Sequence, residues 1–128
     1  MVKQITNRIN AKKDLEYTNS AFWMWWAPGL LAVIGGVAYS SGLLSLAIVG
    51  GLWSVLVIWI GIGCFINGKR CGRVHCKIDG ILFPVLGIIG FLGVFGIIEA
   101  FNWNYYWLIF FIILCGSFLI ETLWKKYV

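Results

Sequence analysis

The sequence predicts an all-α membrane protein: a four-transmembrane-helix bundle with both termini cytoplasmic. Apolar residues make up 61% of the 128 residues and charged residues only 12%, whereas soluble domains hold about 45–50% apolar and about 25% charged residues. A chain this short cannot bury so much apolar surface in water. Its four apolar runs are each close to the ~20 residues that span a hydrocarbon core. The lipid bilayer is therefore the expected solvent for most of the chain.

The first two helices are expected at about residues 21–39 and 43–66. Ser20 stands where an N-cap side chain accepts a hydrogen bond from a free backbone N–H. Aromatic residues follow at once in the string AFWMWW, which is typical of a membrane interface. A short run of small residues, 40–42, separates the two helices.

The last two helices are expected at about residues 81–99 and 105–124. Pro84 is tolerated in a first helical turn, because the N–H that it lacks has no partner there. Along the third helix a glycine recurs every three residues, and small residues let helix backbones approach closely within a membrane. The stripe is expected to pack the third helix against two neighbours. It consists of Gly87, Gly90, Gly93 and Gly96.

Lys and Arg occur before the first helix, between the second and third, and after the fourth. All three places lie on one side of a four-span bundle, and the two opposite turns contain none. The positive-inside rule therefore places residues 1–20, a basic N-terminal segment, and the loop 67–80 in the cytoplasm. Residues 21–128 form the transmembrane domain of a multi-pass protein of the cytoplasmic (inner) cell membrane. The net charge of +5 follows from this topology, and no nucleic-acid partner is expected.

The loop 67–80, NGKRCGRVHCKIDG, contains the only histidine of the chain. Cys71 and His75 are four residues apart and share one face of a helical turn, and Cys76 follows directly. Cys64 lies one turn before the loop and is the fourth candidate. Thiolate and imidazole ligands suit a soft or borderline metal ion such as Zn, Cu(I) or Hg(II). The sequence thus predicts a metal site at these four residues.

Other interpretations of this region remain open. If Cys64 is not the fourth metal ligand, Glu121 or Asp79 takes that position, or the position stays open. Alternatively, the cysteines are incidental in a reduced loop whose basic residues serve only topology and anionic lipid. Glu99 and Glu121 stand near helix ends, where their carboxylates are expected to reach the membrane interface. Cys115 is expected to be a packing residue.

In size, number of spans and cytoplasmic cysteines, the chain resembles the small mercury-uptake membrane proteins of bacterial resistance systems. Those proteins carry a vicinal cysteine pair in their first helix, and residues 21–39 contain no cysteine. The resemblance is therefore one of architecture, and it implies heavy-metal handling without assigning residue roles. The string CGRVHC, residues 71–76, also resembles one in small uncharacterised prokaryotic membrane proteins.

The sequence favours a small integral membrane protein that binds or passes on a soft metal ion through its Cys/His loop. The alternative is a non-catalytic accessory subunit of a larger membrane complex, such as a membrane-bound oxidoreductase. In either case the expected partners are the bilayer and other membrane proteins in a homo- or hetero-oligomer. Catalysis by this chain alone is not expected, because one histidine without an adjacent acid leaves little for acid–base chemistry.

Overall fold

The computed structural model describes residue 9, residues 13–15 and residues 18–124. The described chain is all-helical, and four of its helices are long and apolar enough to cross a membrane. This confirms the predicted four-helix architecture. Most of the N-terminal segment and the last four residues lie outside the described part of the chain.

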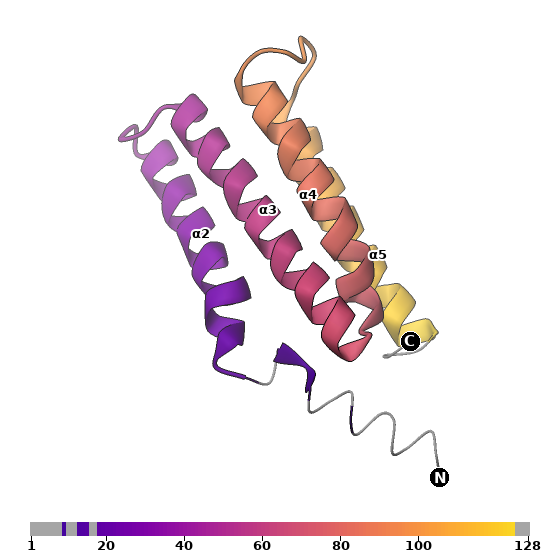
Figure 1. Ribbon diagram of the computed structural model, residues 1–128. Helices are drawn as coiled ribbons and strands as arrows, with labels where there is room; N and C mark the ends of the chain where they lie inside the picture. Colours follow the sequence, from indigo (N-terminus) through magenta and orange to yellow (C-terminus); the bar gives the residue numbers. More distant parts are fainter. Residues whose placement is uncertain (1–8, 10–12, 16–17, 125–128) are drawn as a thin grey trace.

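The chain begins its first span with a π-helical turn, η2 (Phe22–Trp26), which runs directly into α2 (Ala27–Ser40). The later helices are α3 (Leu46–Cys71), α4 (Val74–Val94) and α5 (Trp103–Leu123). Figure 1 shows α3 and α4 as an antiparallel hairpin between α2 and α5. The start of η2, the α3–α4 turn and the end of α5 lie at one end of the bundle, and the two longer connections lie at the other.

The turn between α3 and α4 is much shorter than the expected loop 67–80. Helix α3 continues to Cys71, and α4 begins at Val74. Gly72 ends α3 in the left-handed region with φ 72°, and its N–H bonds to the carbonyl of Gly68. Polar residues alone do not end a helix, whereas a left-handed glycine does. The expected metal-binding loop is therefore two helix ends joined by a tight turn.

Glycines bring α3 and α4 into close contact. A Cβ on Gly80 would lie 2.6 Å from the Cα of Phe65, and one on Gly87 would lie 2.8 Å from the carbonyl oxygen of Ser54. Any larger residue would push the two backbones apart, as expected for small residues between membrane helices. The α3–α4 hairpin is thus the tightly packed centre of the bundle.

The predicted glycine stripe meets two neighbouring helices, as expected. Gly90 lies between Ser54 of α3 and Tyr106 of α5, and Gly93 faces the ring of Phe101 before α5. Gly96 differs, because it stands after the end of α4 with φ 70°. Its role is to turn the chain rather than to pack a helix.

Helix α2 lies at the edge of the bundle. Its buried residues are Pro28 and Gly35. Trp53 of α3 packs against Gly35 and Gly36 of α2, and its indole N–H donates to the carbonyl of Ala32 at 3.0 Å. On its other side, Trp53 packs edge-on against Trp107 of α5. One tryptophan therefore bridges three helices.

Candidate functional site

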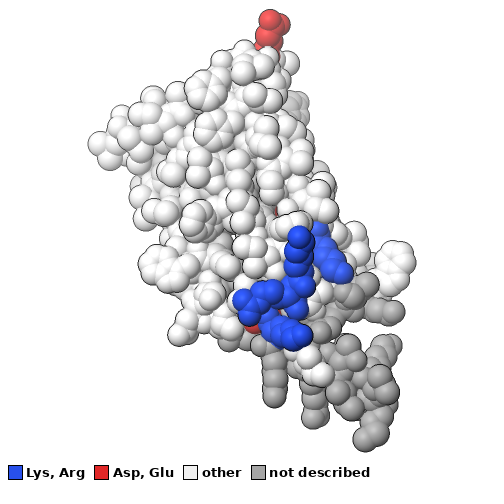
Figure 2. Space-filling model, in the orientation of Figure 1, with Lys and Arg blue, Asp and Glu red and all other residues white. Residues whose placement is uncertain are grey.

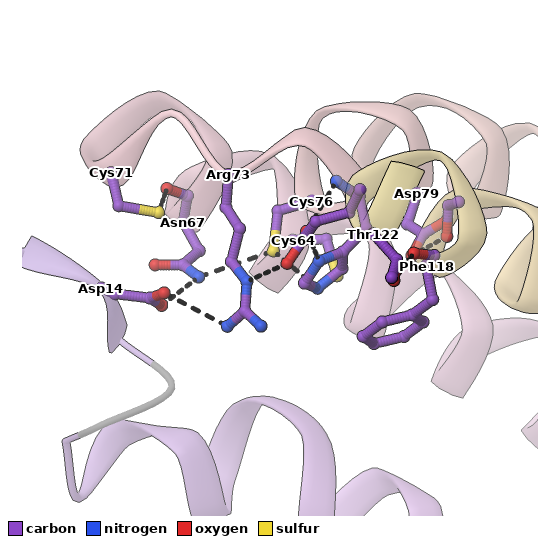
Figure 3. A network of polar contacts seen from close by, with 12 residues as sticks. Asp14, Cys64, Asn67, Cys71, Arg73, Cys76, Asp79, Phe118 and Thr122 are labelled. Atoms are coloured by element: carbon purple, nitrogen blue, oxygen red, sulfur yellow. Dashed lines mark hydrogen bonds and ion pairs between the residues drawn. The ribbon is translucent and has the colours of Figure 1, made fainter. Parts of the chain in front are cut away.

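A buried polar cluster occupies the end of the bundle that carries the α3–α4 turn (Figure 3). Its side chains come from the N-terminal segment and from α3, α4, α5 and the turn itself. Polar groups are costly to bury in an apolar medium unless they pair with one another. The charged and polar residues of the cluster, each at most 8% exposed, are Asp14, Asn67, Arg73, His75, Asp79, Ser117 and Glu121.

Three of the four predicted metal ligands meet in this cluster. The thiols of Cys64 and Cys76 lie near each other across the α3–α4 interface and interact electrostatically (Figure 3). The Sγ of Cys76 lies 3.3 Å from the Nε2 of His75. Trp25 of η2 donates its indole N–H to the Sγ of Cys64, also at 3.3 Å. Cys64, Cys76 and His75 are defined from here on as the thiol cluster.

Cys71 does not join the thiol cluster. It is 1% exposed, and its thiol donates to the backbone carbonyl of Asn67 at 3.1 Å. This is a bond to the residue four positions earlier, which is available because α3 stays helical up to Cys71. The side chain of Asn67 contacts the thiol cluster, because its Nδ2 donates to the Sγ of Cys76 at 3.5 Å.

Glu121 of α5 holds the imidazole of His75 in place. Its Oε2 pairs with the Nδ1 of His75 and accepts the backbone N–H of the same residue at 3.2 Å. His75 is the second residue of α4, where the helix leaves N–H groups without partners. A carboxylate from another helix thus caps α4 and turns the Nε2 of His75 toward Cys76. The ring of Phe118 stacks on the imidazole with 4.3 Å between centroids.

Arg73, in the α3–α4 turn, joins this site to the N-terminal segment. Its Nε donates to Glu121 at 3.1 Å, and an Nη donates to Asp14 at 3.2 Å. Burial alone would lower the pKa of Arg73, but the hydrogen bonds and charges of Glu121 and Asp14 raise that pKa above its ordinary value. The guanidinium is therefore a fixed positive charge inside the cluster.

Two expectations from the sequence are corrected here. Glu121 was expected to reach the membrane interface, but it is 8% exposed and paired inside the bundle. Arg73 was explained by topology alone, but it is 6% exposed and bonds two carboxylates. The cause is the same for both residues: opposite charges at one end of the bundle neutralise each other when the helices assemble.

Asn67 is not among the site residues that the sequence predicts, although it ties the N-terminal segment to α3. Its Oδ1 accepts the backbone N–H of Leu15, and its Nδ2 donates to Asp14, each at 2.8 Å. Asp14 is fully buried. A carboxylate and an amide that lie 53 positions apart give no signal of contact in a single sequence.

The other alternative ligand, Asp79, lies in α4 and is 1% exposed. Ser117 of α5 donates its hydroxyl to the Oδ2 of Asp79 at 3.1 Å. Within the described residues, no group of three or more His, Cys, Asp and Glu side chains is arranged to hold a metal ion. A closed site with four protein ligands therefore finds no support in this geometry.

Comparison with protein-family models, with curated proteins and with solved structures gives no match to the chain. The chemistry of the site must therefore be inferred from its own side chains. These are two neighbouring thiols that interact, an imidazole oriented by a carboxylate, and a buried guanidinium that neutralises the carboxylate.

Proposed function

We propose that the protein binds a soft metal ion, Cu(I) or Hg(II), as cargo at the thiols of Cys64 and Cys76. The observation that carries this proposal is the pair of buried, interacting thiols on facing sides of α3 and α4, with the Nε2 of His75 3.3 Å from the sulfur of Cys76. Soft ions select thiolate ligands. Two thiolates are enough for Cu(I) or Hg(II), whereas structural zinc requires four ligands.

His75 has a defined role in such binding. A thiol must lose its proton to become a metal ligand, so binding releases protons. The Nε2 of His75 faces Cys76 and is placed to accept that proton. The imidazolium that results lies against Glu121, whose second oxygen is bound by Arg73. The buried ion pair thus prepares the site for the charge that appears when the metal enters.

The neighbouring hydrogen-bond donors also favour the thiolate form of the two cysteines. The indole N–H of Trp25 points to the sulfur of Cys64, and the amide of Asn67 points to that of Cys76. Hydrogen bonds donated to a thiolate stabilise its charged form. Trp25 belongs to the π-helical turn η2, a type of distortion that is frequent at functional sites.

We further propose that the thiol cluster lies at the cytoplasmic face of the inner membrane. Lys and Arg side chains gather at this end of the molecule (Figure 2). Lys69, Arg70 and Lys77 are exposed beside the α3–α4 turn, where the positive-inside rule expects cytoplasmic charge. The reducing conditions of the cytoplasm keep such thiols free to bind metal.

The test is metal analysis of detergent-purified protein loaded with Cu(I) or Hg(II) under reducing conditions. The wild-type protein is expected to retain about one ion per chain, and Cys64→Ser or Cys76→Ser to lose it. Cys115→Ser is the matched control, because Cys115 is exposed on α5, away from the cluster. Cys71→Ser distinguishes binding by the thiol pair from binding by the four ligands that the sequence predicts, because only the second needs Cys71.

If Cys71→Ser retains the metal ion, the result supports the thiol pair. If Cys71→Ser loses the ion while Cys64→Ser retains it, the ligands are Cys71, His75 and Cys76 instead. Wild-type protein that holds no more metal than the Cys64→Ser, Cys76→Ser double variant rules out the proposal. Circular dichroism of each variant checks that the helices are formed.

A role as accessory subunit is the second candidate, and the position of α2 favours it. This helix buries only Pro28 and Gly35 within the described chain and leaves apolar side chains such as Val33 at 64% exposure. A partner subunit would cover this face in place of lipid. Native mass spectrometry of complexes extracted from the membrane tests it, and a chain released only as monomers opposes it.

A further inference from the structure

A cavity of about 220 Å³ lies beside the thiol cluster, between η2 and helices α3, α4 and α5. Its walls include the aromatic side chains of Trp25, Trp26, Phe83 and Phe118. Trp26 is 65% exposed, so the wall of the cavity reaches the outer surface of the bundle. An apolar protein cavity of about 150 Å³ holds benzene. This cavity therefore has room for one small aromatic group that arrives from the membrane.

Asp79 lines this mainly apolar cavity together with His75 and Cys64 of the thiol cluster. Asp79 is 1% exposed, and its Oδ2 accepts the hydroxyl of Ser117. Its Oδ1 is buried and has no hydrogen-bond partner among the described residues. Leaving a buried acceptor unpaired costs about 1–3 kcal/mol, and more when the group is charged. A donor brought by a ligand would satisfy this oxygen.

The neighbouring basic side chains are occupied elsewhere. His75, one helical turn before Asp79, directs Nδ1 to Glu121 and Nε2 to Cys76. Arg73 bonds Glu121 and Asp14. None of the described residues that line the cavity is Lys or Arg. Asp79 is thus part of a mainly apolar lining in which the basic side chain, His75, already pairs with Glu121.

We propose that this cavity binds a lipophilic amine in its protonated form. The ammonium N–H donates to the Oδ1 of Asp79, and the apolar body of the amine packs against Trp25 and Trp26. Charge-assisted hydrogen bonds are the strong ones, and aromatic faces attract cations. An ionisable residue within a membrane segment marks a functional site by default. This inference goes beyond metal binding, because it depends on Asp79 rather than on the thiols.

Three probes of similar shape separate charge, hydrogen bonding and apolar contact: 2-phenylethylammonium, 2-phenylethanol and ethylbenzene. Binding to metal-free, detergent-purified protein is measured by isothermal titration. The ammonium is expected to bind at least about tenfold more tightly than the alcohol, as a charge-assisted hydrogen bond predicts. Ethylbenzene, which has no donor, is expected to bind most weakly.

Asp79→Asn keeps the shape of the side chain and removes its charge, so it is expected to abolish the preference for the ammonium. Glu99→Gln is the matched control, because Glu99 is exposed in the connection between α4 and α5 at the other end of the bundle. It is expected to bind all three probes as the wild type does.

Leu114→Trp fills the cavity and leaves Asp79 in place, so it is expected to remove specific binding of every probe. This variant sets the baseline for partition into detergent and keeps the test decisive if Asp79→Asn does not fold. The proposal is overturned if 2-phenylethanol binds as tightly as the ammonium, or if wild-type protein binds the ammonium no better than Leu114→Trp. Neither result bears on metal retention by Cys64 and Cys76, which is measured separately.

Discussion

At the residue scale, the site depends on buried charges that satisfy one another. Glu121 interacts with three groups at once: the imidazole of His75, the backbone N–H of the same residue and the guanidinium of Arg73. Arg73 in turn neutralises Asp14. Removing one member of such a network leaves an uncompensated charge, which costs more than the lost contact itself.

Arg73→Met is therefore expected to destabilise the protein by about 3–5 kcal/mol, the usual cost of breaking a buried ion pair from one side. The measurement is thermal unfolding in detergent, followed by circular dichroism. Adding Glu121→Gln to the variant is expected to recover part of the loss, because one of the two carboxylates that Arg73 neutralised is then uncharged.

Arg70→Met is the control for this prediction. Arg70 is exposed on the last turn of α3, so a change within about 0.5 kcal/mol is expected. Equal effects of Arg70→Met and Arg73→Met would mean that the two arginines share one role in topology, as the sequence alone suggested.

At the element scale, the α3–α4 hairpin places the site. Gly72 ends α3, and α4 begins two residues later. Glycines along both helices then keep the backbones close enough for the thiols of Cys64 and Cys76 to meet. A wider crossing would separate the two sulfurs, so packing between the helices and chemistry at their end are coupled.

Gly80→Ala tests this coupling. The added methyl would lie 2.6 Å from the backbone of Phe65, and such overpacking costs about 1–3 kcal/mol. We expect a lower unfolding temperature together with weaker retention of Cu(I), since the thiol pair is displaced. Metal analysis and thermal unfolding of the same preparation give both results.

Gly116→Ala is the matched control on α5, because nothing lies within 4 Å of the position of its Cβ. Alanine favours a helix over glycine by about 1 kcal/mol, so this variant is expected to be as stable as the wild type or more so. A Gly80→Ala protein with the same behaviour would show that α3 and α4 have room to separate.

At the scale of the whole molecule, charge is distributed unequally between the two ends. Exposed Lys and Arg gather beside the α3–α4 turn (Figure 2), and the exposed acid Glu99 stands in the connection at the opposite end. Such a distribution orients a membrane protein through the retention of positive charge in the cytoplasm.

Cysteine labelling in intact cells tests the proposed orientation. In a Cys115→Ser background, Glu99→Cys is expected to react with a membrane-impermeant maleimide from outside the inner membrane. Lys69→Cys is expected to react only after the membrane is opened. The reverse pattern would place the thiol cluster on the outer face and contradict the proposed topology.

The sequence by itself determined the class of the protein, the number of its helices and the residues of highest interest. Apolar runs of membrane-spanning length are a local property of the chain, so they are visible without contacts. The cluster of Cys64, Cys71, His75 and Cys76 could also be found in this way, because these residues lie within 13 positions.

Only the tertiary structure decided which of these residues face one another. Cys71 turns back to its own helix, while Cys64 meets Cys76 and His75 across the α3–α4 interface. Glu121 and Asp14 joined the site from distant parts of the chain, through Arg73 and Asn67 of the predicted loop. Contacts of this kind depend on how helices pack, and the pattern of apolar residues along one helix does not specify the partner of a polar residue near its end. The need to neutralise charge in an apolar medium then selected the pairs that form.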